Sequence, residues 1–267
     1  MSQIMSGFMK EKEKAASIII LATGSFFRLE ATLLTQPRDP FVDEFCKNIN
    51  NQVQSFLSDF IPEKIQYLNN LLKSDVFNVK DLTSLHSELN IPIPDPPNPE
   101  AEDTKMETDK EEKKAPKCGF LKENEKLQKV LNIVLPEIRT LREGCALIIT
   151  WINYLIPTIE DGNDFGVSVQ EKVLERVAAL KTKLETSQTN ICKYLTERGD
   201  AVAKASKETH VMDYRALVHE KDESAFVDLK LILTDVRNIY IEIFDIILKN
   251  FEKITNPKGE DKNTIKD

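Results

Sequence analysis

The chain has 267 residues, of which only 8 are glycine, and its 36 basic and 44 acidic residues give a net charge of -8. Glycine makes up roughly 7% of average proteins, and it destabilises a helix interior by about 1 kcal/mol. A glycine-poor, charge-rich chain therefore favours helices over Rossmann, P-loop and all-β folds, which need glycine for turns and phosphate cradles. The interleaved charges form no basic face for nucleic acid, and no apolar run reaches the ~18 residues that span a membrane. We expect neither nucleic acid nor a membrane as a partner.

The first 38 residues differ from the rest of the chain. Charged residues at 10–14 precede a mostly apolar stretch at 15–27, an order that resembles a signal peptide. However, Glu11 and Glu13 dilute the positive charge, and no clean cleavage site follows. We interpret residues 1–38 as a variable, disordered leader, with a working signal peptide as the alternative.

Asp39 and Pro40 have the pattern of an N-cap followed by proline at the first helical position, which predicts a helix from 41 to about 73. Apolar residues recur in it every three to five positions, as is typical of an amphipathic helix. Pro62 lies inside this segment, and we expect a kink there because proline lacks the N–H that a helix needs. Residues 39–90 then hold the first helix of a bundle and the segment that follows it.

Residues 91–120 have the composition of a linker. Five prolines lie between positions 92 and 99, and the charged residues that follow include almost nothing to bury. Such a segment does not offset the entropy lost on ordering, so we expect disorder. A plain solvated linker is the simplest interpretation, and a specific partner for it stays open.

Three further amphipathic segments cover residues 122–156, 167–204 and 211–254. Pro136 is expected to kink or restart the first of them, and Gly199 to loosen the end of the second. Four rods of comparable length, most of them joined by short connections, predict an all-α, antiparallel four-helix bundle. Its second to fourth helices lie within 121–254, and 255–267 form a flexible tail. The apolar stripes are broader than one core needs, which favours oligomerisation.

No catalytic site can be assembled from the titratable residues. The histidines, His86, His210 and His219, show no metal-binding or nucleophile spacing, and we interpret each as a surface or helix-end residue. The four cysteines lie far apart without a CxxC motif, so we expect reduced thiols, with a disulfide framework as the weaker alternative. We predict no enzyme activity, no cofactor and no metal.

The connection at 157–166, between the second and third helices, is longer than the two to five residues that a helix–helix turn needs. Three of its residues match positions of a calcium-binding loop: Asp161, Asn163 and Gly166. Phe165 and Lys172 stand where that loop needs oxygen ligands, which argues against calcium.

A protein-contacting loop is the better interpretation of this connection. Gly162 and Asn163 tolerate left-handed backbone angles, Gly166 allows another backbone to approach closely, and Phe165 can anchor the loop on the end of the bundle. The alternative is a turn whose glycines only satisfy the geometry.

Several blocks of sequence carry a resemblance to a known family: Glu160–Val167 continuing into Gln170–Val173, Glu197–Val202, Thr209–Arg215, Leu217–Glu220 and Ile91–Pro96. With them the chain resembles the 11S proteasome activator (REG) family over about residues 41–260. Met106–Lys110 and Pro116–Leu121 are most similar to the beta-type subunit.

The resemblance implies a four-helix protomer of a heptameric ring, which the beta type usually forms together with alpha-type subunits. The ring would cap the alpha-subunit ring of the proteasome core particle, open its gate without ATP and stimulate peptide hydrolysis, including for antigen presentation. The location implied is the cytoplasm, with the nucleus as a second compartment. The activation loop would comprise Ile159, Glu160, Asp161, Gly162, Asn163, Asp164, Phe165 and Gly166.

Two features depart from the family. Residues 1–38 do not resemble its short N-terminus. The tail residues that would dock between core subunits are Thr264, Ile265, Lys266 and Asp267, an ending that lacks the apolar-aromatic character usual for the alpha and beta types. Ile265 can fill an apolar pocket and the Asp267 carboxylate can pair with a lysine; otherwise alpha-type partners supply the anchoring.

The alternative to an activator is a helical scaffold or coiled-coil interaction protein without gate-opening activity.

Overall fold

The computed structural model describes residues 39–93, 119–158 and 164–259. It divides into two units, residues 1–48 and 49–267. The described part of the first unit is the beginning of helix α2 (Pro40–Ser55). This helix starts as predicted, because Asp39 Oδ1 accepts the backbone N–H of Phe41 at 2.8 Å. The predicted leader, and most of the predicted linker, lie outside the described residues.

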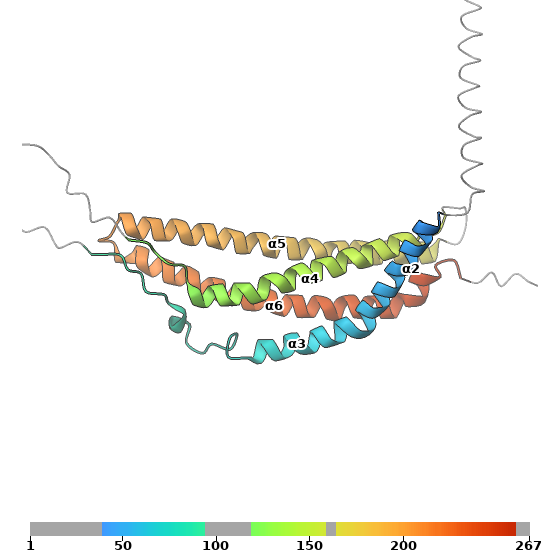
Figure 1. Cartoon of the computed structure of the whole chain (residues 1–267), viewed down its shortest axis with the longest axis horizontal. Helices are drawn as coiled ribbons and strands as arrows, with labels where there is room; N and C mark the ends of the chain where they lie inside the picture. Colours follow the sequence, from blue (N-terminus) through green and yellow to red (C-terminus); the bar gives the residue numbers. More distant parts are fainter. Residues whose placement is uncertain (1–38, 94–118, 159–163, 260–267) are drawn as a thin grey trace, which may run out of the picture. The chain divides into compact units, whose positions relative to one another are not determined.

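The second unit is an antiparallel bundle of long helices (Figure 1). Its main elements are α3 (Ile61–Lys73), α4 (Glu125–Leu155), α5 (Phe165–Lys207) and α6 (Met212–Thr255). Helices α4, α5 and α6 pack against one another, and α3 packs on α6. The described residues contain no strand, and none of their helices is long and apolar enough to cross a bilayer. The predicted all-α four-helix fold is confirmed.

Aliphatic side chains from all four helices form the core of this unit. Along each helix they recur at three- and four-residue spacings, so each helix turns one face inward. Burying one such side chain contributes roughly 1.5–3 kcal/mol. The fully or almost fully buried residues include Ile61, Leu68, Val134, Ile138, Leu141, Ile148, Ile152, Val173, Val177, Leu184, Leu229, Leu233, Val236, Ile243 and Ile247.

The described cysteines, Cys46, Cys145 and Cys192, are free thiols. Cys145 lies in the core of the bundle, and burial raises the pKa of its thiol to about 12. A thiol with such a pKa stays protonated and unreactive at neutral pH. The expectation of free thiols therefore holds for these three, and Cys118 lies outside the described residues.

The two prolines within predicted helices have different effects. Immediately before Pro62 the chain forms a π-helical turn, η1 (Phe56–Phe60), in which the N–H of Ile61 bonds to the carbonyl of Phe56. The predicted interruption at Pro62 thus takes the form of a widened turn. Pro136, in contrast, does not restart its helix, because α4 runs through it without a break. Pro136 and Asn132 are both exposed, so water can reach the carbonyl that this proline leaves unpaired.

The expectation that Gly199 loosens the third helix is wrong. Helix α5 continues through Gly199 for two further turns, to Lys207. A Cβ atom at this position would meet no neighbouring atom, so the glycine lies on a free surface and costs only its helix propensity, about 1 kcal/mol.

A segment without long helices, residues 74–93, follows α3 and lies along the N-terminal half of α6 (Figure 1). Its short 3₁₀ helix η2 (Leu82–Leu85) contacts α6, and the guanidinium of Arg215 donates to the carbonyl of Ile91 at 2.9 Å. This segment covers the part of α6 that α3 is too short to reach. The part of the bundle that packs on this side of α6 therefore consists of helix α3 and of the segment 74–93, which has no long helix.

Candidate functional site

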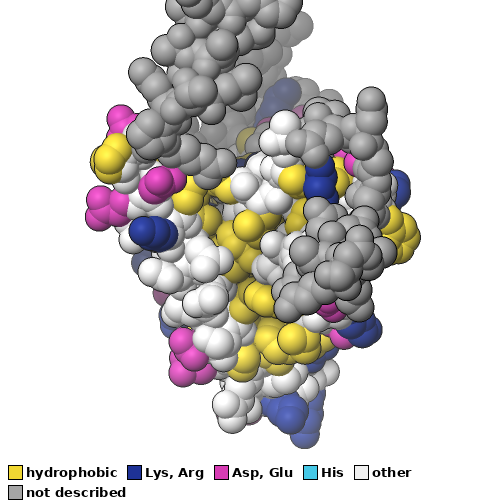
Figure 2. All heavy atoms as spheres, turned by 90° about the vertical axis from the view of Figure 1, so that its right-hand side faces the viewer, with side chains coloured by type: hydrophobic (Ala, Val, Ile, Leu, Met, Phe, Trp, Pro, Cys, Tyr) yellow, Lys and Arg dark blue, Asp and Glu magenta, His cyan; other side chains and the backbone are white. Residues whose placement is uncertain are grey.

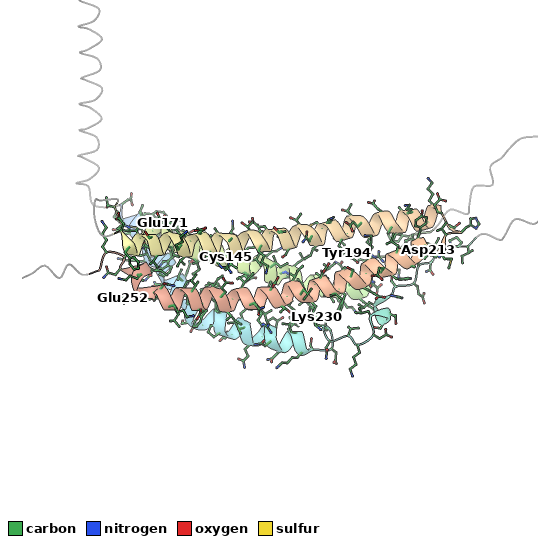
Figure 3. All side chains as sticks on the ribbon, turned by 180° about the vertical axis from the view of Figure 1, so that it is seen from behind. Cys145, Glu171, Tyr194, Asp213, Lys230 and Glu252 are labelled. Carbon is green, nitrogen blue, oxygen red and sulfur yellow. The ribbon has the colours of Figure 1, made fainter. Side chains whose placement is uncertain are left out.

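The predicted activation loop and the predicted C-terminal tail are both rooted at one end of the bundle. This is the end at which α4 and α6 terminate and α5 begins, near Glu171 and Glu252 in Figure 3 and opposite to Asp213. Of the loop, Asp164, Phe165 and Gly166 are described, while 159–163 lie outside the described residues. The tail is described as far as Gly259, so Thr264–Asp267 lie outside them as well.

The side chain of Gln170 joins the two roots. It is fully buried, and its Nε2 donates to the carbonyl of Leu155 at 3.1 Å and to the carbonyl of Ile254 at 2.7 Å. Leu155 is the last residue of α4, and Ile254 is next to the last of α6. Carbonyls at the end of a helix have no partner within it, so one amide group satisfies two of them from different helices.

Backbone packing joins the same two segments a second time. A Cβ atom at Gly166 would collide with the backbone of Pro257. The last residue of the loop therefore touches the first residues of the tail, and only glycine leaves room for this approach. The expectation of a close backbone approach at Gly166 is confirmed.

A third link lies nearer to the surface, where Lys258 Nζ donates to the carbonyl of Thr158 at 3.2 Å. We call these three contacts the end junction: Gln170 with Leu155 and Ile254, Gly166 with Pro257, and Lys258 with Thr158. It connects both ends of the loop to the root of the tail.

The expectation that Phe165 anchors the loop on the bundle is wrong, because its side chain is 70% exposed. Phe165 is the first residue of α5, so it lies at the end of the bundle at which α4 and α6 terminate. Figure 2 faces this end and shows hydrophobic side chains exposed on it. The ring of Phe165 is available to a partner.

An open, apolar groove of about 530 Å³ lies between α6 and the residues that precede and form η1. Leu248 and Phe251 line it from α6 and are 64% and 42% exposed. Leu57 lines the other side. Exposed apolar residues that gather in a groove are typical of a surface that another protein covers.

The other half of the bundle holds a buried polar cluster around Asp222, whose side chain is inaccessible to solvent. Its Oδ1 accepts from Tyr194 Oη at 2.8 Å and from Arg198 Nε at 2.7 Å, and its Oδ2 accepts from Asn124 Nδ2 at 2.8 Å. Asn124 also caps α4, because its side chain accepts the N–H groups of Lys126 and Leu127. The Asp222 carboxylate on α6 thus accepts two donors from α5 and one from the N-cap of α4. These charge-assisted hydrogen bonds hold α4, α5 and α6 together.

His86 and His219 lie together, which corrects their interpretation as surface or helix-end residues, whereas His210 is exposed as expected. Their rings stack with centroids 4.2 Å apart, and His86 Nε2 lies 2.5 Å from Glu223 Oε1. Burial lowers the pKa of His219, and the neighbouring His86 lowers it further. Since these histidines come from distant segments, no local spacing could have predicted the pair. In the described parts of the chain, no group of three or more metal-ligating side chains is found.

Gln170 lies within one of the sequence motifs, but the sequence alone assigns it no role at this site. A signal for it exists, because Gln170 continues the three- and four-residue spacing of the buried residues Val173 and Val177. A polar residue in such a stripe needs a buried hydrogen-bond partner. Which partner it has depends on the packing of three helices.

Two family models match the chain. The model of the PA28 proteasome activator N-terminal region matches residues 37–96, and that of the PA28 C-terminal region matches residues 120–264. Among curated relatives, Proteasome activator complex subunit 2 of Bos taurus is 61% identical over 84% of this chain and 93% of its own length. The Homo sapiens protein of that name is 60% identical with the same coverage. This agrees with the resemblance to the beta-type subunit.

More distant relatives and solved structures agree. Proteasome activator complex subunit 3 of Gallus gallus is 36% identical over 84% of this chain and 94% of its own length. The crystal structure of the 11S subunit of the Plasmodium falciparum proteasome, PA28, has a TM-score of 0.66 at 28% identity and covers 84% of this chain and 97% of its own. The two family models, these relatives and the shared four-helix fold lead to one conclusion: the chain belongs to the PA28 family of proteasome activators.

Proposed function

We propose that this chain is an activator subunit that caps the proteasome core particle and opens its gate, without ATP and without catalysing a reaction itself. Membership of the PA28 family supports the activating role. The observation that carries the mechanism is the end junction, which brings the roots of loop and tail together at one end of the bundle. A subunit that binds with its tail and acts with its loop needs both on the same side.

In this proposal the tail and the loop have different functions. Thr264–Asp267 enter pockets between subunits of the core's alpha ring and supply binding. Ile159–Gly166 displace the gate, and the exposed ring of Phe165 is one of the groups available for this contact. The loop opens the gate if it contacts the open form better than the closed form, because a ligand shifts an equilibrium only by its differential affinity.

We further propose that the subunit works in a heptameric ring that it forms with alpha-type subunits. The apolar groove lined by Leu57, Leu248 and Phe251 supports an interface with a neighbouring subunit. Several tails on one ring raise avidity by about 10² to 10⁴ over a single weak tail. The cytoplasm, with the nucleus as a second compartment, and a role in antigen processing complete the proposal.

Hydrolysis of a small fluorogenic peptide by purified core particle tests this function. The core is assayed alone, with this chain, with an alpha-type subunit, and with both subunits. We expect stimulation by the mixed assembly above that of the alpha-type subunit alone, with no need for ATP. The mass of the assembly distinguishes a closed ring from a dimeric coiled coil. A dimer that leaves hydrolysis unchanged contradicts the proposal and favours a helical scaffold.

A further inference from the structure

We infer that Gln170 is a positioning residue, which fixes the activation loop against the root of the tail so that docking of the tail brings the loop to the gate. This inference rests on the proposed function and adds to it a means by which binding and opening are coupled. At the end junction, one side chain contacts the ends of two other helices.

The placement of Gln170 makes it suited to this role. It lies on the first turns of α5, just after the loop, and bonds to Leu155, the residue at which α4 ends and the chain enters the loop. Its second bond goes to Ile254, at the end of α6, directly before the tail. A single buried amide group, on the helix that follows the loop, therefore bonds to the helix that precedes the loop and to the helix that precedes the tail.

Packing alone does not explain a glutamine at this position. Its Oε1 is buried without a hydrogen-bond partner among the described residues, and an unpaired buried polar atom destabilises a fold. An apolar side chain of similar volume would remove the unpaired oxygen, but it would leave the carbonyls of Leu155 and Ile254 without this donor. What glutamine provides is a directional donor to two carbonyls, which sets the end of α4 against the end of α6.

The other two links restrain the same segments. Pro257 lies against Gly166 too closely for any side chain to come between them, and Lys258 reaches back to Thr158. Movement of the tail root relative to the loop would have to break all three links. Holding the root of the loop against the root of the tail limits how far the loop can be displaced from the gate, and a displaced contact loses its differential affinity.

The test separates binding from opening. Gln170→Met retains the approximate volume and removes the donor. We expect the variant to assemble as the wild type does and to bind the core with unchanged affinity, measured directly on immobilised core particle. At saturating concentrations its maximal stimulation of peptide hydrolysis should fall about fivefold or more, in the range of typical coupling between sites.

Val177→Ala is the matched control. Val177 is fully buried on the same helix, two turns further from the loop, and its truncation lowers stability without touching the end junction. We expect it to lower the melting temperature at least as much as Gln170→Met while leaving maximal stimulation unchanged. If it reduces stimulation equally, the effect is one of stability and the inference is wrong.

Lys258→Met is a second variant, which removes the outermost link without altering the core of the bundle. Its maximal stimulation should also fall at unchanged affinity, so the inference stays testable if Gln170→Met does not fold. Full stimulation by the folded variants, or stimulation restored by raising their concentration, overturns the inference and leaves the proposed function intact. A wild-type chain that does not stimulate in either type of ring overturns both.

Discussion

At the residue scale, the end junction connects the root of the loop to the root of the tail through contacts of the described residues. Gly166 was expected to allow a close backbone approach, and its partner is the backbone of Pro257. Gln170 stood in a recognisable motif, but its role depends on Leu155 and Ile254, which lie on other helices. Residue types thus indicated where such contacts were possible, and the packing decided which of them formed.

Two glycines provide a matched pair for testing the junction. Gly166→Ala should lower the free energy of unfolding by about 1–3 kcal/mol, because the new methyl group forces the backbone of Pro257 aside. Gly199→Ala should raise it by about 0.5–1 kcal/mol, because this helical position has room for a methyl group and alanine has the better propensity. Thermal and urea unfolding check both changes. Equal effects of the two substitutions contradict the close approach at Gly166.

Asn163→Trp tests the loop itself. A bulky ring in the loop should leave ring assembly and core binding intact and abolish stimulated peptide hydrolysis, because only contacts with the gate are lost. Assembly is measured by mass, binding on immobilised core, and stimulation with a fluorogenic peptide. Asn78→Trp, at an exposed position outside the loop, is the control and should keep full activity. Undiminished stimulation by Asn163→Trp removes the assignment of the loop.

At the element scale, the helices follow from apolar spacing and capping residues, and their observed ends lie close to the predicted ones. The spacing could not predict how each proline is accommodated. Pro62 follows a π-helical turn, whereas Pro136 lies within a continuous helix on its exposed side. Ser58, whose carbonyl would accept the N–H that Pro62 lacks, is exposed just as Asn132 is, so solvent exposure does not account for the difference.

The contact between residues 74–93 and α6 should depend on pH through His219. Its pKa is lowered in the folded chain, first by burial and then by His86, with Arg198 acting in the same direction and Asp222 and Glu223 opposing. The unfolded chain therefore binds more protons just below the ordinary pKa of 6.5, so stability falls as the pH drops through this window. Urea unfolding at pH 7.5 and at pH 5.5 measures the effect.

His219→Gln is the variant that isolates this contribution. It keeps a polar side chain of similar length and cannot titrate, so the loss of stability between the two pH values should be smaller than in the wild type. His86, Asp222, Arg198 and Glu223 are retained in this variant. An unchanged pH dependence shows that His219 does not contribute.

At the scale of the whole molecule, one end of the bundle carries the roots of loop and tail, and an apolar groove along α6 faces outward. A ring that uses such grooves between subunits would present all its loops and tails on one side. The resulting avidity permits each tail to be weak. This matters here because residues 260–267 are polar apart from Ile265.

Removal of Thr264–Asp267 tests whether this subunit contributes to docking. In a ring made of this chain alone, the deletion should weaken core binding by about 10²-fold or more, because every tail is lost at once. In a mixed ring the loss should be smaller, since the alpha-type tails remain. Direct binding to immobilised core measures both. Unchanged affinity in both kinds of ring means that the tail of this subunit does not dock.

The sequence by itself determined that the chain is helical, where its helices lie, which stripe of each faces a core, and which family its motifs resemble. These are local properties, because helix periodicity, capping and motif spacing depend on neighbouring residues. Only the tertiary structure decided that Gln170 joins α4, α5 and α6, that His86 stacks on His219, and that Phe165 is exposed. Each of these depends on the packing of segments that are distant in the chain. Hydrophobic periodicity shows which face of a helix is buried, but it does not specify which helix ends contact each other.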